Sequence, residues 1–294
     1  MGLPGSGRST LFAALTGGQG PVGTVPIPDE RLEPVAAIES SAKITPVALE
    51  VVDVPGTGLA LLGNLRQMDA LLGVVDAFSG TRDTAADREA LLLEMVVADR
   101  DHVEGRLERV RTQAKSGDPR LREEVAELER VLAHAEAGHP LSEYPGQLPR
   151  ELEPLTMKPL VAIENGPSGV DLKLEAELAE LPPAEAAEFR EGPSALESVL
   201  REVFAGADLI TFFTAGPTET RAWTLTRGQT ALDAAEAIHT DIARGFIRCE
   251  VIPWDEFVAA GTRAEARRRG LERVEGKTYV VADGDVLNVR FNVG

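Results

Sequence analysis

The first residues of the chain have the spacing of a phosphate-binding loop. Gly2, Gly7, Arg8 and Ser9 fit the pattern G-x-x-x-x-G-K-[ST], with arginine in place of lysine. Glycines in such a loop let backbone N–H groups turn inward around phosphates, and a helix that begins at Ser9 directs its positive end at them. The Ser9 hydroxyl is in the position that ligates Mg²⁺. The predicted nucleotide contacts also include Gly5, Ser6 and Thr10.

A second short motif follows the next apolar stretch. Asp53-Val54-Pro55-Gly56 matches the D-x-x-G motif of G-domains, in which the aspartate holds Mg²⁺ through water and the glycine amide senses the γ-phosphate. Asp53 is therefore a predicted metal residue, and Gly56 a predicted nucleotide contact. Both motifs also have a purely structural explanation, because Asp, Pro and Gly are common in turns and a glycine-rich turn often precedes a helix.

These motifs need a sheet and helices to position them. The spacing of Leu11, Phe12 and Leu15 predicts a helix over residues 9–16, and residues 17–30 are rich enough in Gly and Pro to predict a loop. Buried strands separated by helices favour an α/β fold with a parallel sheet. The predicted strands are Val47–Val54, Leu71–Phe78 and Pro159–Ile163.

A helical hairpin is predicted between the second and third of these strands. Two long amphipathic patterns, Asp87–Lys115 and Leu121–Ala137, are separated by a break at residues 117–119. Asp118 suits a helix N-cap, and Pro119 suits the first helical position. Two helices joined by a short turn form an antiparallel pair. Such an arm either offers a surface to a partner or packs on its own domain.

From Leu209 onward the sequence is rich in strands. One helix, Ala231–Ala243, interrupts them, and a small mixed sheet holding one helix is a β-grasp arrangement. His239 is expected to cap or pack the end of that helix, and Cys249 is expected to be a small core residue. The predicted strands are Leu209–Thr214, Ala222–Leu225, Phe246–Ile252, Thr278–Val281 and Val286–Phe291.

Composition limits the class of function. The net charge of −18 should repel nucleic acid, so the chain is not expected to bind DNA or RNA generally. One local basic cluster can contact RNA phosphates or can simply balance nearby acids. No apolar run is long enough for a membrane helix, no signal peptide is apparent, and a single cysteine favours a cytoplasmic protein. The basic cluster comprises Arg263, Arg267, Arg268 and Arg269.

Several segments together resemble the YchF / Obg-like ATPase family. The resemblance is carried by Gly2-Leu3-Pro4 with Ser9-Thr10-Leu11-Phe12, and most specifically by Phe213-Thr214-Ala215-Gly216, Gly245-Phe246-Ile247-Arg248 and Asp283-Gly284-Asp285-Val286. It implies a P-loop G-domain in two parts (1–79 and 146–208), an inserted helical hairpin (80–145) and a C-terminal β-grasp TGS domain (209–294). It also implies a monomer that binds ATP with Mg²⁺, hydrolyses it slowly and associates with the ribosome.

The chain departs from the family pattern at its site. Arg8 stands where the family has lysine, and the exchange is not conservative. Gly17 aligns with the Mg²⁺-binding threonine of the first switch, and both switches are short. Asn165 aligns with the base-recognition asparagine and predicts a nucleotide contact together with Gly166, but Ser168 replaces the family's glutamate, which leaves ATP and GTP undistinguished. The family's strand before the loop is missing, for which a misassigned start codon is the expected explanation.

Two functions follow from these observations. The first is a nucleotide-binding protein for ATP or GTP, with weak or absent hydrolysis, that associates with the ribosome. The second is an adaptor without turnover, a pseudo-NTPase that binds a partner or rRNA through the TGS domain and the helical arm.

Overall fold

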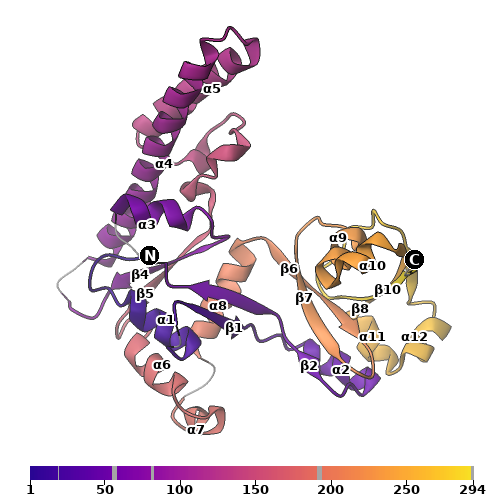
Figure 1. Ribbon diagram of the computed structural model, residues 1–294. Coiled ribbons are helices and arrows are strands. Elements are labelled where there is room, and N and C mark those ends of the chain that lie inside the picture. The colour runs from indigo at the N-terminus through magenta and orange to yellow at the C-terminus, as the bar shows by residue number, and fades with distance from the viewer. Residues whose placement is uncertain (19, 55–57, 81–82, 191–193, 293–294) are drawn as a thin grey trace. The chain divides into compact units, whose positions relative to one another are not determined.

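The chain forms two compact units, which are described separately. The N-terminal unit comprises residues 1–23 and 51–199, and the C-terminal unit comprises residues 24–50 and 200–294 (Figure 1). Residues 24–50 thus cluster with the C-terminal region, and the four-part division predicted from the sequence stays a prediction. No helix in the described residues is long and apolar enough to cross a membrane. The computed structural model describes residues 1–18, 20–54, 58–80, 83–190 and 194–292.

Two parallel strands form the centre of the N-terminal unit. β4 (Leu71–Asp76) pairs with β5 (Leu160–Asn165) in unbroken register, and both predicted strands are thereby confirmed. Gly2 adds a single parallel bridge to Val74 on the other side of β4. Val74 and Val75 are almost fully buried, as β-branched residues in a covered sheet should be. α1 (Arg8–Thr16) packs against α6 (Leu172–Ala179) beside these strands.

A second pair of strands differs from the prediction. β1 (Val22–Pro26) lies inside the stretch predicted to be a loop, because Gly23 and Pro26 conceal a short strand. β3 (Ala48–Val52) was predicted as a strand and is one, but the prediction that it is buried was wrong, since its residues are half-buried or exposed. β1 and β3 pair in a two-stranded sheet.

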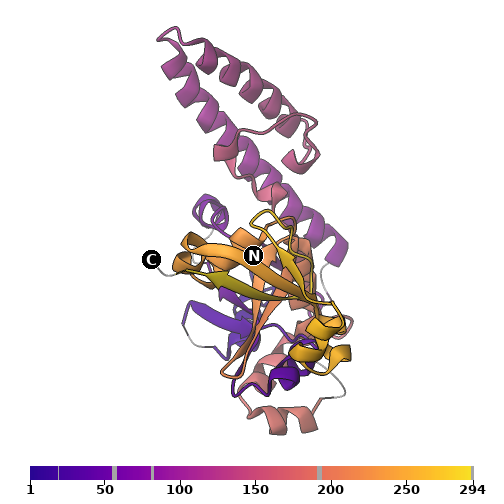
Figure 2. The ribbon, with the colours of Figure 1, turned by 90° about the vertical axis from the view of Figure 1, so that its right-hand side faces the viewer.

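The predicted helical hairpin is present. α4 (Thr84–Ala114) and α5 (Pro119–Glu136) lie side by side in both views (Figures 1 and 2). The Asp118 side chain accepts a hydrogen bond of 2.9 Å from the Arg120 N–H, so the predicted cap is confirmed. The hairpin is held by a buried apolar seam: Val103, Leu107, Val110, Leu128 and Val131.

A buried carboxylate fixes the base of the hairpin. Asp99 of α4 is 1% exposed and accepts hydrogen bonds from the N–H groups of Leu155 and Thr156 at 2.8 and 2.9 Å. It also accepts from Thr156 Oγ1 and from Arg66 Nη1, both at 2.7 Å. Arg66 in turn donates to the Glu153 carbonyl. This network ties the segments before and after the hairpin to α4.

The C-terminal unit is built on a six-stranded mixed sheet. In spatial order its strands are β2 (Ile44–Thr45), β7 (Thr220–Thr226), β6 (Leu209–Ala215), β10 (Asp285–Phe291), β8 (Phe246–Pro253) and β9 (Arg273–Glu275). β6 pairs antiparallel with β7 and parallel with β10, and β10 pairs antiparallel with β8. Phe212 and Phe213 on β6 enter apolar clusters on opposite faces of the sheet, which explains the continuous apolar run in that strand. The α/β class is confirmed, and the assignment of residues 209–294 to a TGS domain stays a prediction.

Two predictions for this unit need correction. The predicted helix Ala231–Ala243 is interrupted at His239, whose Nδ1 accepts a hydrogen bond from the Asp241 N–H, so the expected capping role is confirmed. The predicted strand Thr278–Val281 was wrong, because it is reduced to one bridge between Thr230 and Val280. Cys249 is buried as expected, and burial raises its pKa to about 12.

The remaining elements complete the two units. In the N-terminal unit they are α3 (Gly58–Leu65), α7 (Pro183–Glu188) and the short 3-10 helices η1 (Leu141–Glu143), η2 (Arg150–Leu152) and η3 (Leu155–Met157). α8 (Ala195–Gly206) leads from one unit into the other. In the C-terminal unit they are α2 (Leu32–Glu39), β2 (Ile44–Thr45), β6 (Leu209–Ala215), β7 (Thr220–Thr226), α9 (Ala231–Ile238), α10 (Thr240–Arg244), β8 (Phe246–Pro253), α11 (Trp254–Ala260), α12 (Arg263–Arg268), β9 (Arg273–Glu275) and β10 (Asp285–Phe291).

Replacing Asp99 should destabilise the N-terminal unit selectively. Asp99→Ala leaves the buried Arg66 guanidinium uncompensated and two backbone N–H groups without an acceptor, so we expect a loss of about 3–5 kcal/mol in the free energy of unfolding. Both tryptophans, Trp223 and Trp254, lie in the C-terminal unit. Urea unfolding followed by circular dichroism should therefore shift, while the tryptophan fluorescence transition should not.

The matched control is Asp101→Ala, two residues along the same helix. The Asp101 side chain is 37% exposed and pairs with Arg100 at the surface, so its removal should leave both transitions in place. Equal stability of the Asp99 and Asp101 variants would contradict the role assigned to the buried network.

Candidate nucleotide-binding site

The glycine-rich loop turns sharply between Gly2, which bridges to Val74 of β4, and the start of α1. The Ser6 N–H donates to the Leu3 carbonyl at 3.1 Å, and Gly5 and Gly7 have φ values of 83° and 104°. These positive φ values favour glycine. At Gly7 an added Cβ would also lie 2.5 Å from Asn165 Nδ2, so the Asn165 side chain would have to move. The predicted loop conformation therefore depends on the residue types found at these positions.

Several backbone N–H groups in this loop and in the first turn of α1 have no acceptor among the described residues. The first bond of α1 runs from the Leu11 N–H to the Gly7 carbonyl at 2.9 Å, and no side chain caps this helix. The unsatisfied groups sit at the positive end of a nine-residue helix, which is a favourable place for an anion. Within the described ranges no acceptor is found for the N–H groups of Gly5, Gly7, Arg8, Ser9 and Thr10.

Arg8 and Asp53 meet, although the sequence assigned them separate roles. Arg8 Nε lies 3.4 Å from Asp53 Oδ1, and the two side chains are 33% and 26% exposed. The Asp53 backbone N–H donates to the Pro21 carbonyl, which holds the end of β3 at this point. Neither Nη group of Arg8 contacts a described residue closely enough for a hydrogen bond. The contact is therefore an ion pair, and the guanidinium donors form no hydrogen bond with the described residues.

These residues fit Mg²⁺ poorly. Mg²⁺ requires near-octahedral coordination by oxygen, and protein sites supply it with one or two carboxylates besides phosphate and water. Here the Asp53 carboxylate already pairs with Arg8, and Ser9 offers a single exposed hydroxyl. The metal role of Ser9 and Asp53 stays a prediction.

Asn165 links the loop to the sheet. Its Nδ2 donates to the Ser6 carbonyl at 2.9 Å, and its Oδ1 accepts from the Leu172 N–H at 3.4 Å. Asn165 therefore joins the end of β5, the loop and the start of α6. The Ser6 side chain is buried, and its Oγ finds no partner within the described residues, so Ser6 contributes through its backbone.

Gly166 allows the ends of β4 and β5 to approach each other. A Cβ on Gly166 would lie 2.6 Å from the Ala77 carbonyl carbon and 2.8 Å from the Phe78 nitrogen. The N–H of Gly166 donates to the Val170 carbonyl at 3.0 Å. Gly166 thus shapes the strand ends by being small.

Phe78 is a candidate contact that the sequence analysis missed. Its side chain is 76% exposed directly after β4, and its N–H donates to Asp76 Oδ1 at 2.9 Å. Ligands of open α/β sheets bind at the carboxyl ends of the strands, and an exposed aromatic ring there can stack on a base. The available signal was an aromatic residue just beyond a strand that ends in aspartate. Gly56, another predicted contact, lies outside the described residues.

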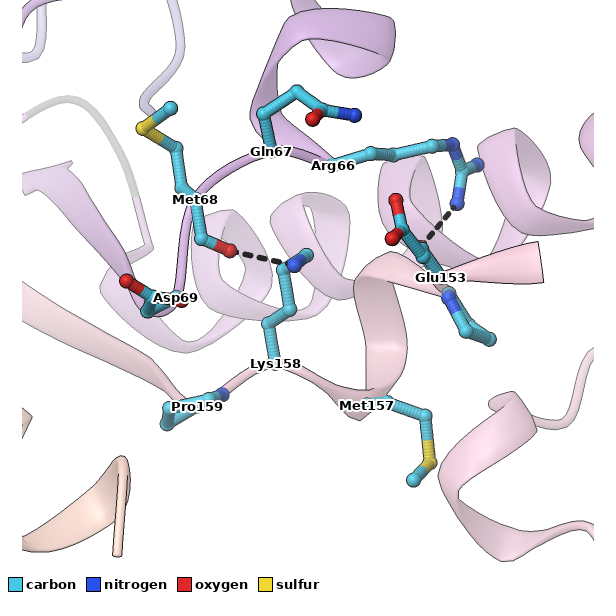
Figure 3. Close-up of a pocket in the computed structure, with 9 residues that line it drawn as sticks. Arg66, Gln67, Met68, Asp69, Glu153, Met157, Lys158 and Pro159 are labelled. Atoms are coloured by element: carbon cyan, nitrogen blue, oxygen red, sulfur yellow. Dashed lines mark hydrogen bonds between the residues drawn. The ribbon is translucent and has the colours of Figure 1, made fainter. Parts of the chain in front are cut away.

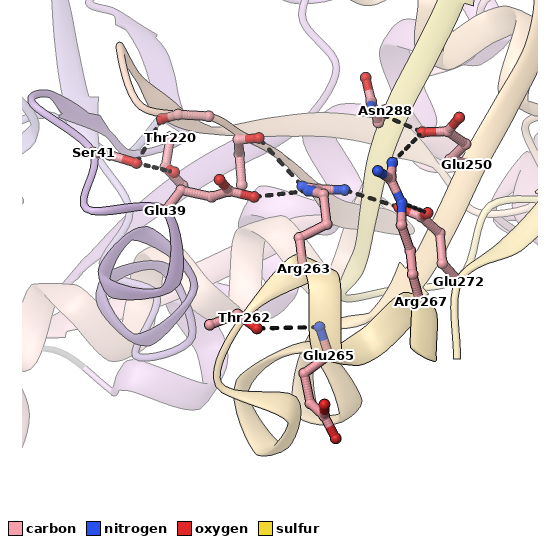
Figure 4. A network of polar contacts seen from close by, with 12 residues as sticks. Glu39, Ser41, Thr220, Glu250, Thr262, Arg263, Glu265, Arg267, Glu272 and Asn288 are labelled. Atoms are coloured by element: carbon pink, nitrogen blue, oxygen red, sulfur yellow. Dashed lines mark hydrogen bonds and ion pairs between the residues drawn. The ribbon is translucent and has the colours of Figure 1, made fainter. Parts of the chain in front are cut away.

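The four arginines predicted to contact RNA lie in the C-terminal unit, and all are ion-paired. Arg263 is the most enclosed: its Nε lies 2.7 Å from Glu39, its Nη1 lies 3.3 Å from Glu272, and its side chain is 15% exposed (Figure 4). Arg267 pairs with Glu272 and with Glu250. These two arginines therefore connect α2, α12 and the sheet.

The other two arginines form a surface pair with a single acid. Arg268 and Arg269 each lie 2.6 Å from Glu265. Any RNA phosphate would compete with these carboxylates. The RNA contact stays a prediction, and only Arg268 and Arg269 can test it without breaking the interior network.

A separate pocket lies at the base of the hairpin and is not the candidate site. It has a volume of about 340 Å³, and the cationic groups on its wall are already engaged: Lys158 Nζ donates to the Met68 carbonyl and Arg66 to the Glu153 carbonyl (Figure 3). In the loop, by contrast, the N–H groups of Gly5 and Gly7 have no acceptor within the described part of the chain.

Removing Arg263 should destabilise the C-terminal unit. Arg263→Ala leaves the buried Glu272 and the half-buried Glu39 without this cation, so we expect a loss of about 2–3 kcal/mol. The tryptophan fluorescence transition in urea measures it. Arg268→Ala, at a side chain that is 76% exposed, is the control and should leave the transition unchanged. A pair of variants with the same midpoint would contradict the structural role of Arg263.

Comparisons with known proteins agree with this architecture. The family model YchF-GTPase_C, described as a protein of unknown function (DUF933), matches residues 209–292. The solved YchF GTPase of Schizosaccharomyces pombe superimposes with a TM-score of 0.84 at 24% identity, covering 99% of this chain and 96% of that one. A GTP-binding protein from Pyrococcus horikoshii OT3 gives a TM-score of 0.62 at 18% identity, covering 99% and 98%. At these identities the two structures show the fold.

Sequence relatives cover the whole chain. The ribosome-binding ATPase YchF of Bacillus subtilis is 34% identical over 359 residues, covering 100% of this chain and 98% of that protein. The protein of the same name from Escherichia coli O157:H7 is 35% identical over 357 residues, with the same coverage. Both alignments are longer than the 294-residue chain, so this chain is shorter at internal positions. The chain belongs to the YchF family.

Proposed function

We propose that this protein binds a nucleoside triphosphate, ATP or GTP, at residues 2–10, hydrolyses it weakly or not at all, and associates with the ribosome. The observation that carries the proposal is the set of N–H groups around the start of α1, those of Gly5 and of residues 7–10, for which the described residues provide no acceptor. Phosphate oxygens can accept from several such groups at once. Arg8 adds a positive charge with unused donors beside them.

The ends of β4 and β5 complete the proposed site on the base side. Phe78 supplies an exposed aromatic face, and Gly166 lies against its backbone. Asn165 holds the phosphate loop to this edge through Ser6. Base stacking tolerates either purine, so these contacts are compatible with both ATP and GTP.

Slow turnover is proposed because Arg8 and Asp53 pair with each other. Phosphoryl transfer depends on a cation and on switch groups positioned together around the γ-phosphate. In this chain the cationic residue of the loop pairs with Asp53, and the donor set suits Mg²⁺ poorly. Related proteins are named ATPases, but the chemistry of the side chains here favours binding over hydrolysis.

Ribosome association is proposed because the relatives are named ribosome-binding. The helical hairpin and the C-terminal unit are the candidate surfaces for this association. An adaptor that uses these surfaces without turnover is the second candidate, and the Arg8–Asp53 pair is the observation that favours it. Nucleotide binding separates the two, since an adaptor without a functional loop would bind neither ATP nor GTP.

Phe78→Ala should weaken nucleotide binding. Loss of one base-stacking ring costs about 1–3 kcal/mol, which corresponds to a rise in Kd of about 5-fold to 150-fold. Calorimetric titration with ATP and with GTP measures it. Phe189→Ala is the control, because Phe189 is 69% exposed in the same unit but follows α7 and no sheet strand. Equal affinities of the wild type and the Phe78 variant would rule out the stacking role.

Charge reversal at Arg268 and Arg269 should test the RNA contact. Each phosphate contact contributes to binding and to its salt dependence, so an Arg268→Glu/Arg269→Glu variant should co-sediment less with ribosomes if the contact exists. The variant spares Arg263 and Arg267, so it should keep the wild-type unfolding transition. Unchanged co-sedimentation by this folded variant would place the ribosome contact elsewhere.

A further inference from the structure

The contact between Arg8 and Asp53 brings together the two motif residues that would normally serve phosphate and metal. Resting on the proposed function, we propose that Arg8 takes the place of the divalent cation in this site, so that the triphosphate binds without Mg²⁺. Three features of the described residues support this proposal: the geometry of the guanidinium, the charges around Asp53, and the N–H donors of the loop.

The geometry leaves the guanidinium suited to a bridging role. It is planar and carries five N–H donors. Its Nε faces Asp53 Oδ1 at 3.4 Å, while its Nη groups find no partner in the described residues. The Arg8 guanidinium can therefore keep its contact with the Asp53 carboxylate and still donate two parallel hydrogen bonds to a phosphate. A divalent cation bridging Asp53 and phosphate would connect the same two groups.

The positive charge of Arg8 beside Asp53 makes a divalent cation unnecessary there. A cation that approaches Asp53 meets a carboxylate already compensated by Arg8, and it must sit beside a fixed positive charge or displace it. Mg²⁺ loses its water reluctantly and binds where oxygen ligands are free. Ser9 is the other predicted ligand, and this exposed residue offers a single neutral oxygen.

The loop supplies the rest of the attraction. The N–H groups of Gly5 and of residues 7–10 are neutral donors at a helix terminus, and such donors can bind phosphate without an ion. Together with one guanidinium they can hold a triphosphate, although such a site lacks the second positive charge that assists γ-phosphate departure. The inference thus also accounts for weak turnover.

The test compares ATP binding, with GTP in parallel, by calorimetry in EDTA and in excess MgCl₂. The wild-type Kd should differ by less than about threefold between the two buffers. Arg8→Ala should bind weakly in EDTA and should be tightened about tenfold or more by Mg²⁺, because the freed Asp53 then needs the ion. Arg111→Ala, which removes an exposed arginine paired with Glu129 on the hairpin, should behave as the wild type.

The outcomes separate the inference from the proposed function. Wild-type binding that Mg²⁺ tightens tenfold or more would overturn the inference and leave the proposed function standing. A folded Arg8→Ala variant that Mg²⁺ does not rescue would also overturn it, because Arg8 would then do something other than replace the ion. No binding of either nucleotide by the wild type in either buffer would overturn the proposed function itself. Circular dichroism confirms folding of each variant.

Discussion

The parallel register of β4 and β5 determines where the candidate site lies. Asp76 and Asn165 end the two strands as partners, so the residues that follow them, Phe78 and Gly166, emerge at one edge. Gly2 pairs with Val74 on the same strand, which brings the start of the loop to that edge as well. Asn165 then closes the arrangement by bonding to Ser6. A shift of one residue in this ladder would separate the loop from the strand ends.

Ion pairs with nearby carboxylates determine the role of several arginines in this acidic chain. With 30 basic against 48 acidic residues, almost any guanidinium has carboxylates within reach. Arg66, Arg263 and Arg267 are consequently structural, since each satisfies buried or half-buried acids. Arg8 differs, because its pair with Asp53 leaves both Nη groups without a contact in the described residues. A cluster of arginines in a sequence is thus weak evidence for RNA binding when the surrounding acids are numerous.

Much of the fold followed from the sequence, and the exceptions have physical causes. The hairpin and the two central strands have strong periodicity and clear caps, so Asp118 and the β4–β5 pair were predictable. β1 was not, since Gly23 and Pro26 read as loop, and the break at His239 depends on one side-chain bond within a continuous helical pattern. Asp99 was missed because an acid in a charged helix looks exposed. The Arg8–Asp53 contact joins residues 45 positions apart, which spacing alone cannot reveal.

The most direct test of the account is amide hydrogen exchange of the loop with nucleotide bound. Exchange at residues 5–10, apart from Ser6, should slow strongly when ATP or GTP saturates the protein, because these N–H groups become hydrogen-bonded to phosphate oxygens. Exchange at residues 263–269 should not change. Unaltered exchange at residues 5–10, in a protein shown by calorimetry to be saturated, would contradict the claim that this loop holds the phosphates.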